Sequence, residues 1–279
     1  MRGKSITGLA LLIVMMCSCT PVKRAYNNPE GPKFVGMIAK EPPDFDGEVK
    51  VVTYNIKLGK NIEQTIHELD SVPELRDPDV IFLQEMDPGG VNDIAHHLQY
   101  NFVYYPAALH STHEKDFGNA ILTKWPIKAY RKLILPYEHP IRKMYRIAVF
   151  ALLEMGKLEV LTCCVHTEIY ILGHEKKLEQ VQAVVGNISD HYPYVIVGGD
   201  FNTDIDYQIE EMEKVFGEAG FVRVTEGVGA THKGDPLGLI KFEFDHIFAR
   251  GFEVMSAGKV KEAEASDHLP VWTVLRLKN

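Results

Sequence analysis

Short apolar runs that end in polar side chains recur along this chain. The clearest run covers residues 194–197, where apolar and β-branched side chains are typical of a strand buried on both faces. Gly198 and Gly199 then remove side-chain bulk where the strand is expected to end. Asp200 and Asn202 follow, and an extended backbone would direct both to the same side. The stretch fits two oxygen ligands at the mouth of a site, or a strand followed by an Asx-type turn.

Similar runs predict the other elements of one large α/β body. Apolar side chains three and four residues apart predict an amphipathic helix over residues 175–189. Helices are also expected over residues 61–76, interrupted by Pro73, and over residues 207–216. Many strands, few helices and a mixture of hairpins and crossovers favour two packed sheets. The further strands are expected over residues 49–56, 79–85, 119–122, 145–153, 158–165, 242–248, 252–258 and 271–277.

The N-terminus has the pattern of a secretory signal. Arg2 and Lys4 precede an apolar segment of residues 8–16, which is too short to span a membrane as a mature helix. Cysteines replace the usual small-residue cleavage site, an arrangement that resembles bacterial lipoprotein signals. We expect residues 1–18 to be removed and Cys19 to carry the lipid, with Cys17 as the alternative lipidation site and a short membrane anchor as the alternative to a signal.

This resemblance predicts attachment to a membrane through the N-terminal lipid, in the bacterial cell envelope, on the periplasmic side or at the cell surface. Residues 19–47 are rich in Pro, Asn, Lys and Glu and have no clear periodicity, so we expect a partly disordered tether. A short apolar stretch, residues 34–38, is the part of the tether expected to pack on the body. The folded domain is expected over residues 48–279.

Composition and charge narrow the classes of function. The 279 residues are 46% hydrophobic and 24% charged, as in ordinary globular proteins. A formal net charge of −8 excludes tight, nonspecific duplex binding through bulk charge. Outside the signal the cysteines are Cys163 and Cys164, which as neighbours in a strand point to opposite faces and cannot easily bridge. We therefore expect two buried apolar side chains and no disulfide framework.

Polar side chains gather where the predicted strands end. Each has an ordinary explanation by itself, such as a turn residue for Asn55, a surface charge for Glu85 or a core histidine for His166. Those separate explanations do not account for the fact that all these polar residues fall at the ends of predicted strands, so we expect them to form one site. They are Asn55, Glu85, His166, Asp200, Asn202 and residues 266–268, together with Asp245 inside the run of residues 242–248.

Taken in chain order, these residues resemble the motifs of the endonuclease/exonuclease/phosphatase superfamily, the deoxyribonuclease-I-like group. The resemblance covers about residues 49–277 and implies a four-layer α-β-β-α sandwich of two packed mixed sheets, which we expect to be a monomer. The matching segments are TYNI at residues 53–56, LQE at 83–85, GNAIL at 118–122, VHT at 165–167, GGDFN at 198–202, DHI at 245–247 and SDH at 266–268.

The resemblance implies a divalent metal held by Glu85, with help from Asn55 and Asp267. Carboxylate and amide oxygens without cysteine suit a hard ion, Mg²⁺ or Mn²⁺. A cation is also required electrostatically, because each carboxylate repels an anionic phosphoester by about 1 kcal/mol at 4 Å in water and about 4 kcal/mol at an effective dielectric of 20.

The resemblance also implies roles in catalysis and substrate binding. Asp200 and Asn202 would orient the attacking water and the scissile phosphate, and Asp245 would orient His268. Either Asp200 or His268 would take the proton of the water, with His268 preferred and a rate optimum near neutral pH expected. The second histidine, His166, would bind phosphate or assist the leaving oxygen. Asn119 and Arg146 are expected to line the substrate site.

Two segments depart from the family pattern. The helix after His166 usually carries Arg-x-x-Gln, whereas this chain has Lys177 and Gln180, so a planar guanidinium is replaced by a point charge. Residues 231–241 match no pattern that indicates a substrate.

The resemblance implies a metal-dependent phosphoester hydrolase, with a phosphodiesterase or nuclease as the first interpretation. Its partner would be a phosphoester: a nucleic acid, a small phosphodiester or a phospholipid headgroup. The alternatives are a lipid or inositol phosphoesterase of the same fold and a surface binding module without catalysis. The binding module should lack one or more of the acids or histidines, and this chain has them all.

Overall fold

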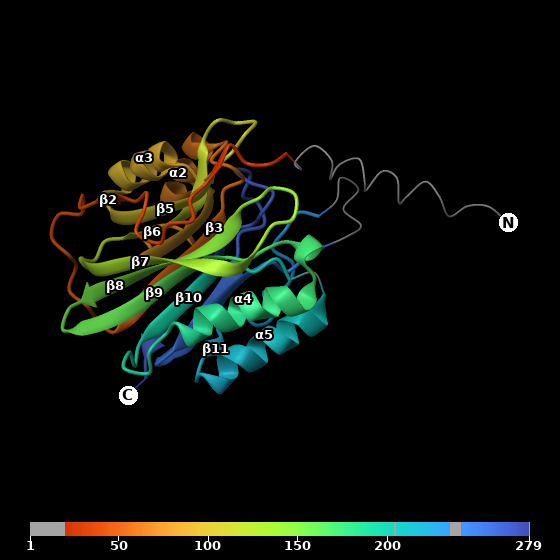
Figure 1. The fold of residues 1–279 in the computed structure, drawn as a ribbon. Helices are drawn as coiled ribbons and strands as arrows, with labels where there is room; N and C mark the ends of the chain where they lie inside the picture. The colour runs from red at the N-terminus through yellow and green to blue at the C-terminus, as the bar shows by residue number, and fades with distance from the viewer. Residues whose placement is uncertain (1–19, 204, 235–240, 279) are drawn as a thin grey trace.

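Two mixed β-sheets packed face to face form the centre of the computed structural model, which describes residues 20–203, 205–234 and 241–278 (Figure 1). The first sheet consists, in spatial order, of β1 (Arg24–Ala25), β5 (Asn101–Leu109), β6 (Asp116–Thr123), β4 (Val80–Met86), β3 (Glu48–Asn55), β14 (Val271–Leu277) and β13 (Phe252–Lys259), and β2 (Phe34–Gly36) also pairs with β5. The second consists of β11 (Val222–Arg223), β12 (Asp245–Arg250), β10 (Val195–Asp200), β9 (Leu158–His166), β8 (Tyr145–Met155) and β7 (Ile127–Glu138).

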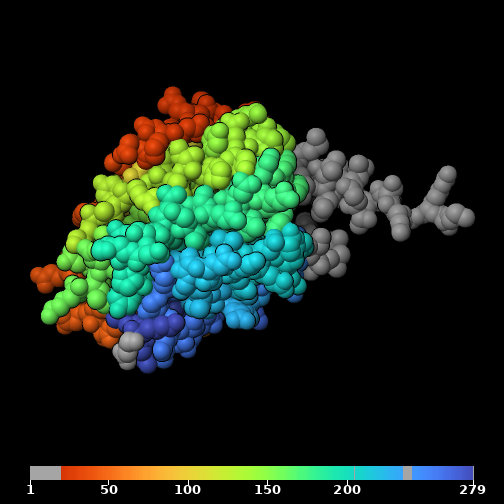
Figure 2. All heavy atoms as spheres, turned by 60° about the horizontal axis from the view of Figure 1, so that its bottom comes forward, coloured from red at the N-terminus to blue at the C-terminus, as the bar shows by residue number. Residues whose placement is uncertain are grey.

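Helices cover the outer face of each sheet and complete four layers. Helices α2 (Ile62–Ser71) and α3 (Pro88–Leu98) pack on the first sheet. Helices α4 (His174–Gly186) and α5 (Asp206–Glu218) pack on the second and lie against each other, as Figure 2 shows from their side. The four-layer sandwich expected from the sequence is therefore confirmed. Within the described residues, none of the helices has the length and apolar character needed to cross a bilayer.

Three hydrophobic cores separate these layers. One lies between the sheets, and one lies under the helices of each sheet. Cys164 belongs to the core between the sheets and Cys163 to the core under α4 and α5, and both are buried and free. This confirms the prediction of two apolar side chains on opposite faces of one strand.

The longer elements without a counterpart among the predicted ones are α3, β5 and β7, and the short β1, β11 and 3-10 helix Tyr170–Leu172 were not predicted either. Helix α3 begins Pro88-Gly89-Gly90, a composition typical of turns. It forms because Asp87 accepts hydrogen bonds from the backbone N–H groups of Gly89 at 3.0 Å and Gly90 at 3.1 Å, while proline at the first helical position needs no partner. The strand predicted over residues 242–248 is displaced, since β12 begins only at Asp245.

The first described residues lie along the edge of the first sheet rather than as free chain. Strand β1 pairs with the end of β5, and β2 pairs with its beginning, which places the apolar residues 34–36 on the body. Residues 1–18 and Cys19, on which the signal and lipidation predictions fall, lie outside the described residues.

The direction of the strands brings the polar strand ends together. Strands β3 and β4 are parallel neighbours in the first sheet, and β9 and β10 are parallel neighbours in the second. The carboxyl ends of all four lie at the same end of the molecule, since a hydrogen bond joins Asn55, at the end of β3, to Asp200, at the end of β10. We call this end the site end.

Candidate active site

Asp200 lies at the centre of the site end, buried between the two sheets. Its Oδ2 accepts a hydrogen bond of 2.9 Å from Nδ2 of Asn55 and lies 3.4 Å from Nε2 of His166 and 3.8 Å from Nε2 of His268. Its Oδ1 accepts a bond of 2.9 Å from the backbone N–H of Asn202. The structure thus brings together four of the polar residues that the sequence places in different segments.

The two glycines before Asp200 allow this close approach. A Cβ on Gly198 would lie 2.6 Å from the ring of Phe82 in the other sheet. A Cβ on Gly199 would lie 1.9 Å from the carbonyl oxygen of Val165 in β9, and its φ of 152° is one that L side chains rarely adopt. Strand β10 does not end at the glycines, as the sequence suggested, but continues through them to Asp200.

The backbone between Asp200 and Asn202 is not extended, so the two side chains do not point to the same side as the sequence predicted. Its φ is 49°, so the chain turns, and its backbone N–H bonds to the Asp200 carboxylate in the Asx-type turn that the sequence left as the alternative. The Asn202 side-chain amide donates to the carbonyl of Thr167 at 3.1 Å. The turn therefore coexists with the site and fixes one oxygen of Asp200.

His268 is held by a chain of hydrogen bonds that begins in an unpredicted segment. Its Nδ1 donates to Oδ2 of Asp245 at 2.9 Å, as expected for an orienting carboxylate. The same oxygen accepts a bond of 2.6 Å from the hydroxyl of Thr231, and that hydroxyl accepts the backbone N–H groups of Phe244 and Asp245, each at 3.0 Å. Thr231 therefore fixes the residue that orients the histidine.

The charges around Asp200 and His268 favour one protonation state. Burial opposes charge on His268, but the carboxylates of Asp245 and Asp200 outweigh it and raise the pKa of the imidazole to about 10. Burial raises the pKa of the Asp200 carboxyl to about 6, and the nearby imidazolium limits that rise. At neutral pH the site thus holds a carboxylate at Asp200 and an imidazolium at His268.

The second histidine has a different environment. His166 is buried, and burial followed by the charge of Arg146 holds the pKa of its imidazole well below the usual range. Nη1 of Arg146 lies 3.0 Å from Nε2 and 3.2 Å from Nδ1 of His166, and its Nε donates to Oε1 of Glu168 at 3.2 Å. A neutral imidazole at this position is a hydrogen-bonding group for an anion, and Glu168 fixes the arginine behind it.

The predicted metal ligands come from the ends of β3 and β4 and from the loop before β14. Asn55 pairs with Gln84 across the parallel strands, so Glu85 follows directly beside it. Glu85 has a φ of 58° at an irregularity in the pairing with β6, an unfavourable backbone conformation for a side chain of this type. Its half-buried carboxylate has no hydrogen bond or ion pair to another described residue.

A carboxylate without a protein cation, beside an amide oxygen, is a donor set that suits a hard divalent ion. Asp267 is tied to the same corner by Lys57, whose ammonium lies 2.7 Å from Oδ2 of Asp267 and whose backbone N–H donates to Oδ1 of Asn55 at 3.0 Å. Glu85, Asn55 and Asp267 therefore offer the oxygen donors that suit a divalent metal, and their role as its ligands stays a prediction.

His232 joins the site although no sequence motif contains it. Its Nε2 lies 3.8 Å from Oδ2 of Asp267, and its ring centroid lies 5.0 Å from that of His268. The carboxylate of Asp267 remains charged, since its bonds to His232 and Lys57 overcome burial and hold its pKa far below the usual range. Residues 231–241 match no family pattern, so the sequence offered no signal for Thr231 or His232.

The lysine that replaces the family arginine supports the site from behind. Lys177 is buried and its Nζ donates to the carbonyl oxygen of Asn202 at 2.7 Å. Gln180 accepts the backbone N–H of Glu168 at 2.8 Å. Asn119 is also buried, and its amide donates to the carbonyl of Ile147 in the other sheet at 3.0 Å. The predicted contact of Asn119 and Arg146 with substrate remains a prediction.

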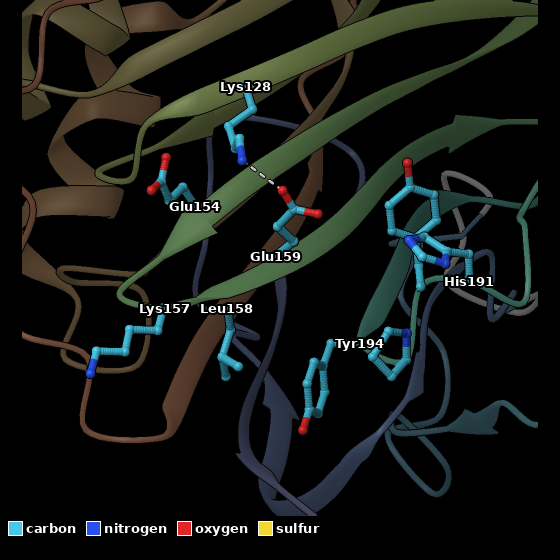
Figure 3. A pocket seen from close by; sticks show the side chains of 9 residues that line it. Lys128, Glu154, Lys157, Leu158, Glu159, His191 and Tyr194 are labelled. Atoms are coloured by element: carbon cyan, nitrogen blue, oxygen red, sulfur yellow. Dashed lines mark hydrogen bonds and ion pairs between the residues drawn. The ribbon is translucent and has the colours of Figure 1, made fainter.

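A surface hollow of about 400 Å³ lies away from these residues, at the opposite end of the second sheet (Figure 3). It lies at the start of β7, the β8–β9 turn and the residues before β10. An ion pair of 2.6 Å between Lys128 and Glu159 crosses it, and Tyr194 lines it. None of the predicted site residues is part of this lining.

Comparisons with known proteins agree with this fold. The model of the Endonuclease/Exonuclease/phosphatase family matches residues 52–268. Among curated proteins, a UPF0294 protein of Vibrio parahaemolyticus is 27% identical over 158 residues, which cover 54% of this chain and 52% of the relative. The chain thus spans about half the length of the curated relatives it matches.

Solved structures share the fold at low sequence identity. An endonuclease/exonuclease/phosphatase from Bacteroides vulgatus is 18% identical with a TM-score of 0.68, and the match covers 83% of this chain and 99% of the other. D. rerio TDP2 complexed with single strand DNA product is 19% identical with a TM-score of 0.64, covering 83% and 100%. A mannosyl-6-phosphatase of Bacteroides thetaiotaomicron is 19% identical with a TM-score of 0.63, covering 81% and 99%.

Proposed function

Because this chain belongs to the endonuclease/exonuclease/phosphatase family, we propose that it is a divalent-metal-dependent phosphoester hydrolase. The observation that carries the proposal is the set of contacts around Asp200. Asn55 from one sheet, His166 from the other and His268 from a connecting loop all place a side-chain nitrogen within 4 Å of one carboxylate oxygen. A non-catalytic binding module would not require this buried and strained arrangement.

Asp200 is the stronger candidate for the base. Its carboxylate accepts a proton from water at neutral pH, whereas His268 carries a proton already, so the charges oppose the alternative of His268 as base. As the water oxygen bonds to phosphorus, the ester P–O bond breaks and the leaving oxygen departs. The proton taken up by Asp200 ends on that oxygen, directly or through solvent, and the carboxylate is restored.

The remaining polar groups stabilise the phosphoryl group. His268, as an imidazolium held by Asp245, donates a charged hydrogen bond to a phosphoryl oxygen. His166, as a neutral imidazole, donates a second bond and gives up no proton. A divalent ion held by Glu85, Asn55 and Asp267 would supply positive charge that polarises the phosphoryl oxygen and stabilises the leaving group.

Proteins of the same fold and the net charge of this chain bear on the size and class of the substrate. One protein of this fold is described with a single strand DNA product and another as a mannosyl-6-phosphatase, so proteins of this fold differ in the size of what they bind. The net charge of −8 disfavours a large polyanion held by bulk charge. We infer a small or lipid-borne phosphoester, with a nuclease as the alternative.

The metal requirement is the first test. Hydrolysis of bis-p-nitrophenyl phosphate, p-nitrophenyl phosphate, inositol phosphates, sphingomyelin and plasmid DNA is measured with Mg²⁺ and with chelator. We expect activity on at least one ester to disappear on chelation and to return with Mg²⁺. Glu85→Gln should raise the Mg²⁺ concentration for half-maximal rate by at least the roughly 10–100-fold that loss of an outer-shell partner causes.

Glu154→Gln is the matched control, because Glu154 is an exposed acid near the opposite end of the second sheet. It should keep the wild-type metal requirement. Hydrolysis that persists after exhaustive chelation would contradict the metal assignment.

A further inference from the structure

The described chain begins at the site end of the molecule. The hydroxyl of Thr20 lies 2.8 Å from that of Ser111, in the loop between β5 and β6. That loop is at the site end, because Gly118 at the start of β6 pairs with Met86 at the end of β4, one residue after Glu85. In Figure 1 the first described residues, in red, reach the same end as the start of α4.

The segment that follows Thr20 is fixed there. The backbone N–H of Val22 donates to the carbonyl of Arg142, in the β7–β8 loop, at 2.9 Å, and that of Lys23 donates to Leu109 at 2.9 Å. Further along, the buried Lys132 donates to the carbonyl of Tyr26 at 3.0 Å. The segment thus bridges two loops of the site end, and Thr20 cannot move away from the site while these bonds hold.

Large apolar side chains are exposed on the loops of this same end. Ile141, in the β7–β8 loop, is 39% exposed. After site residue Asn202, Ile205 is 56% and Tyr207 47% exposed, and Tyr170, four residues after His166, is 48% exposed. They come from three segments at the site end, namely the β7–β8 loop, the 3-10 turn Tyr170–Leu172 after β9 and the start of α5, and we call these four residues the apolar rim. Exposed apolar groups gathered around a site are typical of protein or membrane contact surfaces.

The lipidation predicted for the sequence before Thr20 points to a bilayer as the occupant of this surface. The predicted lipid-bearing residue, Cys19, is the immediate neighbour of Thr20, and one residue spans at most about 3.6 Å. A lipid on Cys19 therefore holds the site end, rather than the opposite end with the C-terminus, against the bilayer. With Cys17 as the lipidated residue, two further residues add roughly 7 Å, which leaves the orientation unchanged.

We propose that the apolar rim docks on the bilayer that holds the N-terminal lipid, so that the site acts on a phosphoester carried by a lipid of that bilayer. The substrate part rests on the proposed function, whereas the docking part does not. The rim inserts apolar side chains while the polar cluster behind it faces the headgroups, the level at which a lipid phosphoester lies. A soluble phosphoester would have to enter past the membrane surface.

Docking is tested without reference to catalysis. The full-length chain is expressed with its signal, its lipid is confirmed by mass spectrometry, and it is reconstituted into vesicles of phosphatidylethanolamine and phosphatidylglycerol. Ile205→Trp places a fluorophore on the rim, and Val254→Trp places one at an exposed apolar position of β13, near the opposite end. After subtraction of the wild-type emission, brominated phospholipids should quench most of the added emission in Ile205→Trp and none in Val254→Trp.

Equal quenching of the two variants, or a chain with no lipid on either cysteine, would overturn the docking.

The substrate class is tested on the same vesicles by release of glycerol phosphate from phosphatidylglycerol and of inorganic phosphate from added phosphatidic acid. A long Gly-Ser spacer between Cys19 and Thr20 should lower these rates roughly tenfold, by lowering the effective concentration of the site at the surface. The rate on bis-p-nitrophenyl phosphate should not fall, because a soluble ester does not have to be held at the membrane surface.

Hydrolysis of the soluble diester without hydrolysis of either lipid would overturn the lipid substrate. Loss of both activities would overturn the proposed function, while the quenching result would still decide the docking.

Discussion

Thr231 illustrates how much of the site depends on residues that touch no reacting atom. Its hydroxyl donates to Asp245 and accepts two backbone N–H groups, so one oxygen fixes both the carboxylate and the start of β12. Asp245 in turn orients His268. Thr231, which belongs to no recognisable motif, therefore helps to determine the position of His268, which belongs to a clear one.

Thr231→Val keeps the shape of the side chain and removes the hydroxyl. We expect the free energy of unfolding to fall by about 1–3 kcal/mol, because buried polar groups lose their partner. We also expect kcat on bis-p-nitrophenyl phosphate to fall, because Asp245 no longer has a fixed position. Urea unfolding and steady-state kinetics measure the two effects.

Thr162→Val is the matched control, since Thr162 is a buried strand residue whose hydroxyl donates to the carbonyl of Ala151, away from the site. It should lose stability and keep its kcat. A Thr231→Val protein with wild-type kcat would show that the orientation of Asp245 does not depend on this hydroxyl.

At the scale of single residues, the sequence predicted the site residues that belong to motifs but not the residues that hold them in place. His268, Asp245 and Asp200 lie where short motifs placed them. Thr231 and His232 were not found, because their segment has no periodicity or motif and reaches the site only through tertiary contacts. Which group acts as the base also depends on burial and neighbouring charges, and a sequence does not give either.

At the scale of elements, the site depends on how closely β9 and β10 approach each other. Gly199 makes this possible, since a Cβ there would lie 1.9 Å from the carbonyl oxygen of Val165. This carbonyl oxygen belongs to the backbone of β9, and the next residue of that strand is His166. A side chain at this position would therefore push apart the two strands that carry Asp200 and His166.

Gly199→Ala should strongly destabilise the protein, and the fraction that folds should lose activity, because relief of the clash must move backbone in β9 or β10. Thermal unfolding and activity per folded molecule check this. Gly186→Ala is the matched control: its Cβ meets no atom within 4 Å at the end of α4, so stability should rise by about 0.5–1 kcal/mol. Equal stability of the two variants would contradict the close-approach argument.

The strands that end in the site were all predicted from the sequence. Strands β3, β4, β9 and β10 are buried apolar runs with polar ends. The bounds of β3, β4 and β9 agree with the prediction within one residue, whereas β10 continues three residues beyond the predicted run to Asp200. Strands β5 and β7 and helix α3 were not predicted. Helix α3 begins with turn-forming residues, and β5 contains Pro106, which disfavours a strand unless tertiary pairing supplies the stability.

At the scale of the whole molecule, two sheets assemble one buried charge cluster. Asp200 comes from the second sheet, Asn55 from the first, and His268 from the loop that leads into β14. Burial between the sheets raises the pKa of the Asp200 carboxyl, and the imidazolium of His268 keeps it from rising further. The titration of Asp200 therefore reports on the closed sandwich rather than on one segment.

The pH dependence of Mg²⁺-dependent hydrolysis of bis-p-nitrophenyl phosphate, in wild type and Asp200→Asn, tests the central claim most directly. With Asp200 as base and His268 as imidazolium, wild-type kcat should rise as pH increases through about 6, where Asp200 deprotonates, and fall near 10, where His268 loses its proton. Asp200→Asn should lose roughly 10²–10⁴-fold in kcat and the limb near 6. A wild-type rate that rises only near pH 10, or an Asp200→Asn variant with wild-type kcat, would contradict the account.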